Sequence, residues 1–494
     1  MKAAATAAPD RAAGSARRRP DASPPVVFMG VPMAINVRDI LRTDAFDVLR
    51  GSGARIHLFT PAADVEGFRR EFGGDGVSIH PLRAPDSRLF AIVDVINLKL
   101  QVALLSLRCD TARIMIGDTL RRSWRARAVR GALALLGRRG QDLLLGFLRR
   151  VLRATAPELY AEEFRDLQPD LVVGTRVLTM SGPRTHSSPR YLDRHLLLSA
   201  ARRRVRTMVL VSSWDNLTTS GFFPVDVDRI TVWNGIMKDQ AMGIHGLRPD
   251  QVVVTGAPQH DTYAGAPYTP RRPFWTAFGL DPDRPVVVYT TGTSGTIPRE
   301  PDIVARLETG LRAAVGPELQ LLVRVHQLDS VDRYTEVAAR PGVVLDHAGR
   351  PPVGSYHDRD FDQAALRHLA DTLHHADVVV NAASSISIDA AAVGTPVVCV
   401  DFDAEDGVPY HRSVSRFYDF THQQPVVASG GVVRARTPEE VVEAVRAYLA
   451  DPALHAEGRA RLVREQCHAV DGGSGRRVGA ALLDALVGAV SPTR

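Results

Sequence analysis

Short hydrophobic runs alternate with longer helical patterns along most of the chain from Val26 onward. Runs rich in β-branched residues lie at 26–31, 54–60, 170–175, 207–212, 229–233 and 251–256, and a second series lies at 286–292, 319–325, 343–346, 377–382 and 396–401. Nearly continuous apolar strands separated by helices are typical of parallel sheets with both faces covered. The pattern therefore predicts an α/β protein.

A segment rich in proline and glycine, residues 256–285, separates the two series of strands. The chain has 494 residues, more than one typical core accommodates, so we predict two doubly wound, Rossmann-like domains facing each other across a cleft. The predicted boundaries are 26–265 for the first domain, 266–284 for a linker and 285–494 for the second domain. A helical pattern near 475–488 could close the second domain or cross back to the first, and these boundaries assign it to the second.

Residues 88–155 break the alternation, because they are helical in pattern and strongly basic. Between Arg121 and Arg153 ten arginines face a single acid, Asp142, and apolar segments and Trp124 lie among them. A basic amphipathic helix with an aromatic residue suits an anionic membrane surface. The same pattern also fits a solvated arginine face on a helix that packs against the core. We favour contact of residues 121–153 with the inner face of a membrane.

Composition narrows the function classes. Residues 1–25 are rich in Ala, Arg and Pro without the apolar stretch of a secretory signal, so we expect a disordered leader. Three distant cysteines without a CxxC pair indicate a reducing compartment, which places the protein in the cytoplasm. No run of 18 uncharged apolar residues occurs, so no membrane-spanning helix is expected. A net charge of +6 is mild for this length and does not indicate nucleic-acid binding.

Cofactor motifs are also missing from the sequence. The sixteen histidines are scattered without metal-ligand spacing, so we predict neither a metal nor another cofactor. The sequence has no P-loop, and no GxGxxG fingerprint opens either domain, which counts against ATPases and dehydrogenases.

The most informative stretch is 374–403, where a hydrophobic strand ends in small residues before Ser384 and Ser385 open a helix. A serine at a helix start satisfies free backbone N–H groups, and the same position attracts anions. A plain helix cap would explain one serine but not two. Ser385 and Asp389 are four residues apart and so share one helix face. We predict that the serines hold a diphosphate while Asp389 reaches a ribose hydroxyl.

Two more loops in the second domain favour phosphate. Arg324 and His326 alternate at the end of the strand 319–325, where a cation and an imidazole together suit a phosphate-rich ligand. The strand 286–292 leads into a loop rich in Thr, Ser and Gly, in which glycine lets backbone amides approach phosphate oxygens. The donor-binding residues predicted there are Thr291, Gly292, Thr293 and Ser294.

In the first domain, the stretch VSSWDNLTTSG (211–221) places Asp215 at the end of a strand, between Trp214 and Asn216. An aspartate in such a place either accepts a proton from a substrate or caps the following turn through a bond to the backbone. We favour the first interpretation.

The order of SSWDN, GAPQHD, VVVYTTGT, LLVRVHQLD and NAASSISIDAAAVGTP resembles the GT-B glycosyltransferases, and most of all the group of CDP-glycerol glycerophosphotransferases and surface polysaccharide transferases. In that group a Trp-His-Gly stretch carries the catalytic base, a Gly-x-Pro-x-x-Asp stretch closes the first domain, and an Arg-x-His-Pro segment and a Ser-Ser helix start bind the nucleotide diphosphate. The sequence departs from this pattern at Asp215, which replaces the base histidine, at Gln327, which replaces the proline, and at Ala382 and Ala383, which replace Asp-Tyr.

The resemblance implies a metal-independent glycosyltransferase that moves a sugar, or a related group, from a nucleotide-diphosphate donor to a hydroxyl group in the synthesis of a cell-surface glycan or glycolipid. Asp215 is then the base, and the loop after Met29 and the loops that carry Trp214, Asn216, Arg176 and His186 line the site of a lipid-linked or glycan acceptor. Three alternatives stay open: a CDP-glycerol-type glycerophosphotransferase, a nucleotide-sugar 2-epimerase, and a non-catalytic GT-B-like protein of polysaccharide assembly.

Overall fold

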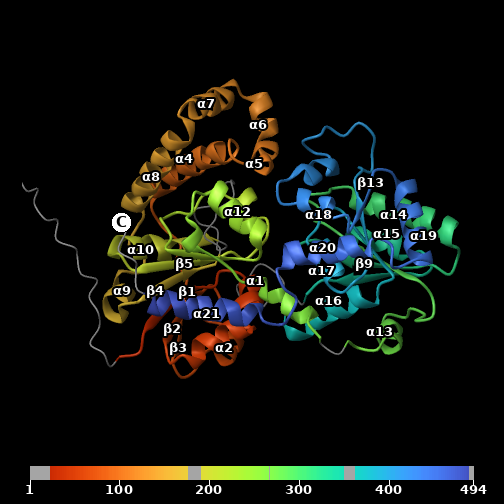
Figure 1. The fold of residues 1–494 in the computed structure, drawn as a ribbon, viewed down its shortest axis with the longest axis horizontal. Coiled ribbons are helices and arrows are strands. Elements are labelled where there is room, and N and C mark those ends of the chain that lie inside the picture. Colours follow the sequence, from red (N-terminus) through yellow and green to blue (C-terminus); the bar gives the residue numbers. More distant parts are fainter. Residues whose placement is uncertain (1–22, 176–190, 266–267, 350–361, 489–494) are drawn as a thin grey trace, which may run out of the picture.

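The computed structural model describes residues 23–175, 191–265, 268–349 and 362–488. Two α/β domains lie side by side, each built on one sheet (Figure 1). Every strand pair in both sheets is parallel, so the predicted fold class is confirmed.

The first sheet has seven strands in the order β3-β2-β1-β4-β5-β6-β7. They are β1 (Val26–Gly30), β2 (Arg55–Thr60), β3 (Val77–Pro81), β4 (Leu171–Gly174), β5 (Arg206–Leu210), β6 (Arg229–Val232) and β7 (Val252–Val254). β1 is buried along its whole length because helices cover both faces of the sheet at its centre. In the register of the sheet, Phe28 lies opposite His57 on one side and Val172 on the other.

The second sheet has six strands in the order β10-β9-β8-β11-β12-β13. They are β8 (Val286–Thr290), β9 (Gln320–Val325), β10 (Val343–His347), β11 (Val378–Asn381), β12 (Val397–Val400) and β13 (Val433–Ala435). The edge strands β3 and β13 were not expected from the sequence.

Helices connect the strands and cover the sheets. In the first domain they are α1 (Ala34–Asn36), the π-helix η1 (Val37–Leu41), α2 (Asp44–Gly51), α3 (Glu66–Phe72), α9 (Ala161–Leu167), α10 (Arg194–Arg203), α11 (Asn216–Thr219), α12 (Gly235–Gly243) and the 3-10 helices η4 (Pro249–Gln251) and η5 (Pro258–Tyr263). The second series is α13 (Arg271–Ala277), α14 (Glu300–Val315), η6 (Val331–Tyr334), α15 (Thr335–Ala338), α16 (Gln363–His375), α17 (Ile386–Ala392), η7 (Val414–Asp419), α18 (Gln424–Ala428), α19 (Pro438–Ala450), α20 (Ala456–Cys467) and α21 (Ser474–Val487).

The basic stretch forms a helical layer on the first domain, at the top of the view in Figure 1. Its helices are α4 (Arg88–Leu105), α5 (Asp110–Met115), α6 (Gly117–Arg122), α7 (Trp124–Leu135) and α8 (Gly137–Thr155). A buried ion pair between Asp94 on α4 and Arg194 on α10 anchors the layer. None of the described helices combines the length and hydrophobicity needed to cross a bilayer.

The last helix corrects the predicted boundary of the second domain. α21 crosses back to the first domain, where Val478, Ala481 and Leu482 are buried in the same hydrophobic core as β1 and α2. Gly479 allows close packing there, since a Cβ atom at this position would lie 2.6 Å from Cβ of Val48. The helical periodicity of residues 475–488 revealed an apolar face, but periodicity does not reveal which sheet that face covers.

Candidate active site

The double serine lies in the tight turn between β11 and α17, and both side chains are partly exposed. Asn381 Oδ1 accepts hydrogen bonds from the backbone N–H of Ser384 at 3.3 Å and from the hydroxyl of Ser387 at 3.0 Å. Ala383 has a left-handed backbone with φ of 42°, and its N–H donates to the Tyr418 hydroxyl at 3.2 Å. The Ser384 hydroxyl also accepts a hydrogen bond from the N–H of Ile386 at 3.3 Å, so the turn is fixed by several bonds while both serines stay partly exposed.

Asp389 is turned away from this exposed site. It is buried, and its Oδ1 lies 3.4 Å from Nε2 of His260 in η5. Burial by itself lowers the pKa of His260, but Cys467 and the Asp389 carboxylate outweigh this effect and raise the pKa to about 10. Asp389 therefore joins α17 to the junction between the domains instead of lying beside the exposed serines.

Arg324 is buried in β9, and Asp346 on the neighbouring strand β10 is its ion-pair partner. His368 also approaches Asp346, with Nε2 3.1 Å from Oδ2. Although burial opposes the effect, Arg324 and His368 lower the pKa of Asp346 to about 2. The guanidinium charge is thus already neutralised inside the domain, which argues against the predicted contact with a donor phosphate.

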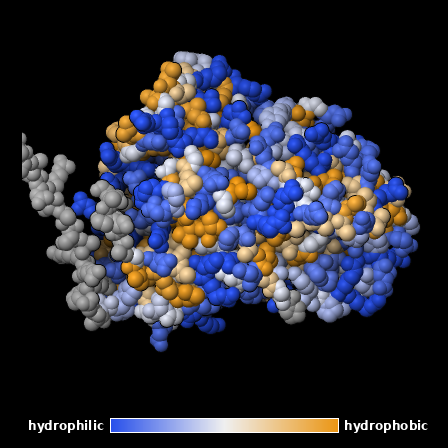
Figure 2. All heavy atoms as spheres, in the orientation of Figure 1, coloured by the Kyte–Doolittle hydropathy of each residue, from blue (hydrophilic) through white to orange (hydrophobic). Residues whose placement is uncertain are grey.

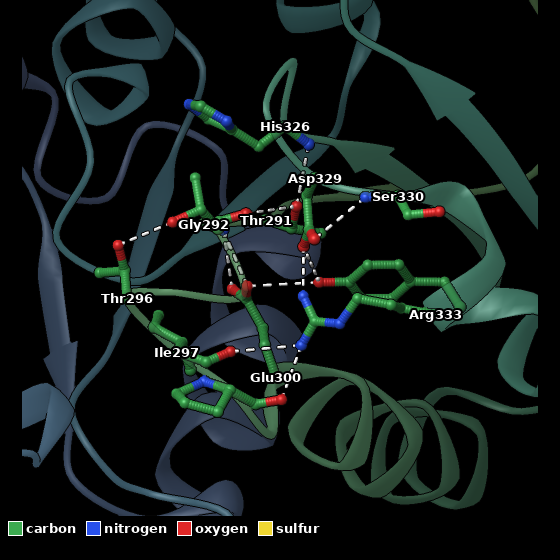
Figure 3. Close-up of polar contacts among 12 residues, drawn as sticks. Thr291, Gly292, Thr296, Ile297, Glu300, His326, Asp329, Ser330 and Arg333 are labelled. Atoms are coloured by element: carbon green, nitrogen blue, oxygen red, sulfur yellow. Dashed lines mark hydrogen bonds and ion pairs between the residues drawn. The ribbon is translucent and has the colours of Figure 1, made fainter.

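His326 and the loop after β8 are joined by a hydrogen bond in which the backbone N–H of His326 donates to Thr291 Oγ1 at 2.9 Å. Nδ1 of the imidazole accepts from the N–H of Leu328 at 3.0 Å. Burial lowers the pKa of His326, so the ring is neutral at pH 7. In Figure 3 the ring points away from the polar cluster below it.

That cluster centres on Glu300, which no sequence motif singles out (Figure 3). Both carboxylate oxygens of Glu300 accept from the N–H of Gly292, at 3.1 and 2.8 Å, and the hydroxyls of Tyr289 and Tyr334 donate to it at 3.1 and 3.3 Å. Burial raises the pKa of Glu300 to about 7. The amide of Gly292 therefore bonds within the protein and not to a phosphate as predicted.

The rest of the loop is more open. Thr293 Oγ1 lies 2.8 Å from Thr296 Oγ1, and Ser294 is exposed at the tip. Below it, Arg333 pairs with Asp329 and donates to the carbonyl of Pro298 at 2.7 Å. These bonds make the loops after β8 and β9 one unit, on which Thr293 is partly exposed and Ser294 is exposed.

Asp215 is half-buried at the start of α11. Its Oδ1 accepts from Ser213 Oγ at 2.5 Å and from Asn216 Nδ2 at 3.4 Å, and its Oδ2 accepts from Thr219 Oγ1 at 3.1 Å. Both oxygens of the carboxylate thus have partners within the same loop.

The Asp215 loop touches the second domain at His422. The buried ring of Trp214 packs edge-on against His422, with centroids 4.8 Å apart, and Thr218 Oγ1 lies 2.8 Å from His422 Nδ1. Burial lowers the pKa of His422 to about 4. Tyr418, four residues earlier, holds the double-serine turn, so residues 418–422 link the two predicted halves of the site.

A narrow pocket lies at the carboxyl ends of β5, β6 and β7. Its polar lining includes Asp39, Ser212, Thr231, Thr255 and Gln259. The sequence placed the loop after Met29 at the acceptor site but did not single out Asp39 within it. Arg176 and His186 lie outside the described residues.

Within the described ranges, no three His, Cys, Asp or Glu side chains gather as metal ligands. Metal independence stays a prediction.

The sequence model of the CDP-glycerol:poly(glycerophosphate) glycerophosphotransferase family matches residues 224–484, which is more than half of the chain. The chain belongs to this family. The region shared with the glycerophosphotransferases contains η5, the loops after β8 and β9 and the double serine, whereas Asp39 and Asp215 precede it. No curated protein matches the sequence.

Solved structures show the same fold at low sequence identity. A putative UDP-N-acetylglucosamine 2-epimerase from Listeria monocytogenes has a TM-score of 0.51 and 10% identity, covering 95% of this chain and 99% of that one. A glycosyltransferase from Rickettsia africae has a TM-score of 0.50 and 8% identity, covering 94% and 100%. The glycerophosphotransferase-family chain thus has the predicted GT-B arrangement of two facing Rossmann-like domains.

Proposed function

We propose that this chain transfers a sugar from a nucleotide-diphosphate donor to a hydroxyl group of a lipid-linked or glycan acceptor in cell-surface glycan synthesis. The observation that carries the proposal is the double-serine turn, which is partly exposed after a parallel strand and lies inside the region shared with the family. Ligands of open α/β sheets bind beyond the carboxyl ends of the strands.

In the proposed reaction the second domain binds the donor. The hydroxyls of Ser384 and Ser385, together with those of Thr293 and Ser294, hold the diphosphate that leaves. The first domain supplies the acceptor site, which includes the loops at the carboxyl ends of β5–β7. No metal ion takes part in this scheme.

Transfer of glycerol phosphate is the second candidate, and the family match favours it. The departures at Asp215, Gln327 and Ala382–Ala383 affect the residues that the resemblance assigns to base and donor binding, and for this reason we place sugar transfer first.

A donor panel separates these candidates. The purified full chain is first screened for thermal stabilisation by UDP, GDP, CDP and dTDP, because a bound ligand raises the melting temperature. It is then incubated with the corresponding nucleotide sugars and with CDP-glycerol, with and without glycan acceptors. Release of nucleotide that needs an acceptor supports transfer, and the donor that supports it identifies the group. An altered sugar without transfer would indicate an epimerase, and binding without turnover a non-catalytic protein.

The S384A/S385A double variant tests the donor site directly. We expect nucleotide affinity to fall at least about tenfold, since hydrogen bonds to a charged group are strong. Thr309→Ala removes an exposed hydroxyl on α14 and serves as the control. Equal affinity of the double variant and the control for the nucleotide would contradict the proposed donor site.

We further propose that the helical layer 88–155 docks on an anionic membrane surface. Eleven of the fifteen large hydrophobic residues that are exposed in the described part of the chain lie in this layer, and Figure 2 shows hydrophobic residues gathered there at the top of the view. On α8, Arg139, Leu143, Phe147 and Arg150 recur at helical spacing and are all exposed. Apolar side chains flanked by arginines suit the boundary between acyl chains and anionic head groups.

Vesicle sedimentation tests the docking surface. We expect the full chain to bind vesicles that contain phosphatidylglycerol and not neutral vesicles. L143S/F147S should weaken binding roughly tenfold, because both side chains would lose apolar burial. L328S/L454S, which changes two exposed leucines of the second domain, should bind like the unmodified chain. Equal binding of both double variants would place the contact elsewhere.

A further inference from the structure

Asp39 lies in η1, the π-helix that follows β1. It is 5% exposed, and Arg38 donates to its Oδ1. Isolated π-helical turns occur often at functional sites, because the extra residue re-aims a side chain. Here the segment brings two charged residues to the carboxyl end of the central strand of the first sheet.

The second carboxylate oxygen of Asp39 is buried without a hydrogen-bond partner among the described residues. The amide oxygen and nitrogen of Asn36, three residues earlier and 0% exposed, also have no partner there. A buried acceptor left without a donor is costly and calls for an explanation. A ligand hydroxyl that donates to Asp39 Oδ2 would provide one.

The position of Asp39 suits a hydroxyl acceptor. Its carboxylate lines the narrow pocket at the ends of β5–β7 together with the hydroxyl-bearing residues Ser212, Thr231 and Thr255. On the other side it faces the junction between the domains, where His260 in η5 of the first domain and Asp389 on α17 of the second contribute to its electrostatic surroundings. Asp389 lies on the helix that follows the double serine, so α17 connects the surroundings of Asp39 with the proposed donor site.

Asp215 has a different environment. Both of its oxygens already accept hydrogen bonds from its own loop, and the second-domain residue that its loop contacts is the buried His422. Asp215 also does not line the pocket that contains Asp39. This pattern is that of an aspartate that holds a turn.

The geometry points to Asp39, and not Asp215, as the proton acceptor of the transfer reaction, an inference that rests on the proposed function. The acceptor hydroxyl donates its proton to Asp39 Oδ2 while its oxygen forms a bond to the anomeric carbon of the donor. The bond between that carbon and the diphosphate oxygen breaks, and the diphosphate leaves with the electron pair. Asp39 then returns the proton to solvent.

The electrostatics agree with this role. Burial raises the pKa of Asp39 and outweighs the opposing effect of Arg38. A base accepts protons best when its pKa lies near the working pH, provided that it remains ionised. Arg38, His260 and Asp389 are the charged or titratable groups that face Asp39. We therefore expect the acidic limb of the kcat/KM profile to report the pKa of Asp39 as these three groups influence it.

The test compares Asp39→Asn and Asp215→Asn in the full chain with the donor and acceptor that the panel identifies. We expect D39N to lower kcat about a hundredfold or more, to lose the acidic limb of the pH profile, and to bind nucleotide as before. D215N should keep the acidic limb. Asp47→Asn, at an exposed site on α2, is the control.

Asp39→Glu separates catalysis from structure. It keeps the carboxylate, so we expect it to retain a measurable acidic limb at reduced kcat even if D39N is poorly folded. The inference is overturned if D39N has the same turnover as the control, or if D215N is the variant that loses the acidic limb. In either case, transfer by the unmodified chain would still support the proposed function. If the unmodified chain transfers nothing from any donor, the proposed function fails and the role of Asp39 fails with it.

Discussion

Glu300 shows how a single buried carboxylate organises a binding loop. It is 0% exposed and accepts hydrogen bonds from Gly292, Tyr289 and Tyr334. Burial penalises its charged form, which is why its pKa rises to about 7. The loop after β8 is therefore held by a group whose charge changes near neutral pH.

Replacing Glu300 with Gln should change how stability depends on pH. The carboxyl has a higher pKa in the folded than in the unfolded chain, so its contribution to stability is fully present below about pH 4.5 and is lost as the pH rises through about 7. Relative to E300Q, the free energy of unfolding of the unmodified chain should fall by about 3 kcal/mol between pH 4.5 and 8. Denaturant titrations across this range measure the difference, and parallel curves for the two proteins would contradict it.

At the residue scale, the sequence identified side chains but not their partners. The sequence predicts that Arg324 binds a phosphate. In the structure, however, the register of β9 and β10 places Asp346 directly opposite Arg324, and the two form an ion pair. Asp389 was correctly placed on the same helix as Ser385, but the helix turns it toward His260. Register and helix orientation come from tertiary packing, and that packing decides which charges remain free.

At the scale of elements, the junction between η5 and α21 depends on one side chain. Asp261 accepts hydrogen bonds from the backbone N–H groups of Ser474 at 3.0 Å and Gly475 at 2.8 Å. It thus satisfies two N–H groups at the start of a helix whose apolar face completes the core of the first domain.

Asp261→Ala should lower the free energy of unfolding by about 1–2 kcal/mol, because two helix-start N–H groups lose their acceptor. Asp283→Ala removes an acid from an exposed ion pair with Arg272 and should cost less than about 1 kcal/mol. Urea titration of both variants provides the comparison, and equal costs would show that the contact does not anchor α21.

Sequence patterns revealed the central strands of both sheets and also the edge strands β7 and β10, whose apolar runs are continuous at VVV and VVL. β3 and β13 are edge strands too, but polar residues interrupt their apolar ones, Ser78 and His80 in β3 and Arg434 in β13. β13 is three residues long and includes Arg434, which pairs with Asp401. Such strands form because a neighbour offers free hydrogen-bonding groups, and their own sequence carries little sign of it.

At the scale of the whole molecule, the sequence predicted two facing domains and a ligand-binding second domain, but not which residues meet between them. The contacts of His422 with Trp214 and Thr218, and of His260 with Asp389, join loops that are far apart in the chain. The periodicity of the sequence does not predict these contacts between domains, because they form only when both sheets have folded and face each other.

The return of α21 to the first domain sets an order for assembly on the ribosome. Strands β1–β7 end at Val254, yet the face that α21 covers stays open until residues 474–487 have emerged. The second sheet and its last packing helix, α20, are complete by Cys467. The half of the protein that is translated first is therefore the half that finishes folding last, and chaperones would meet it with an apolar surface exposed throughout synthesis of the other half.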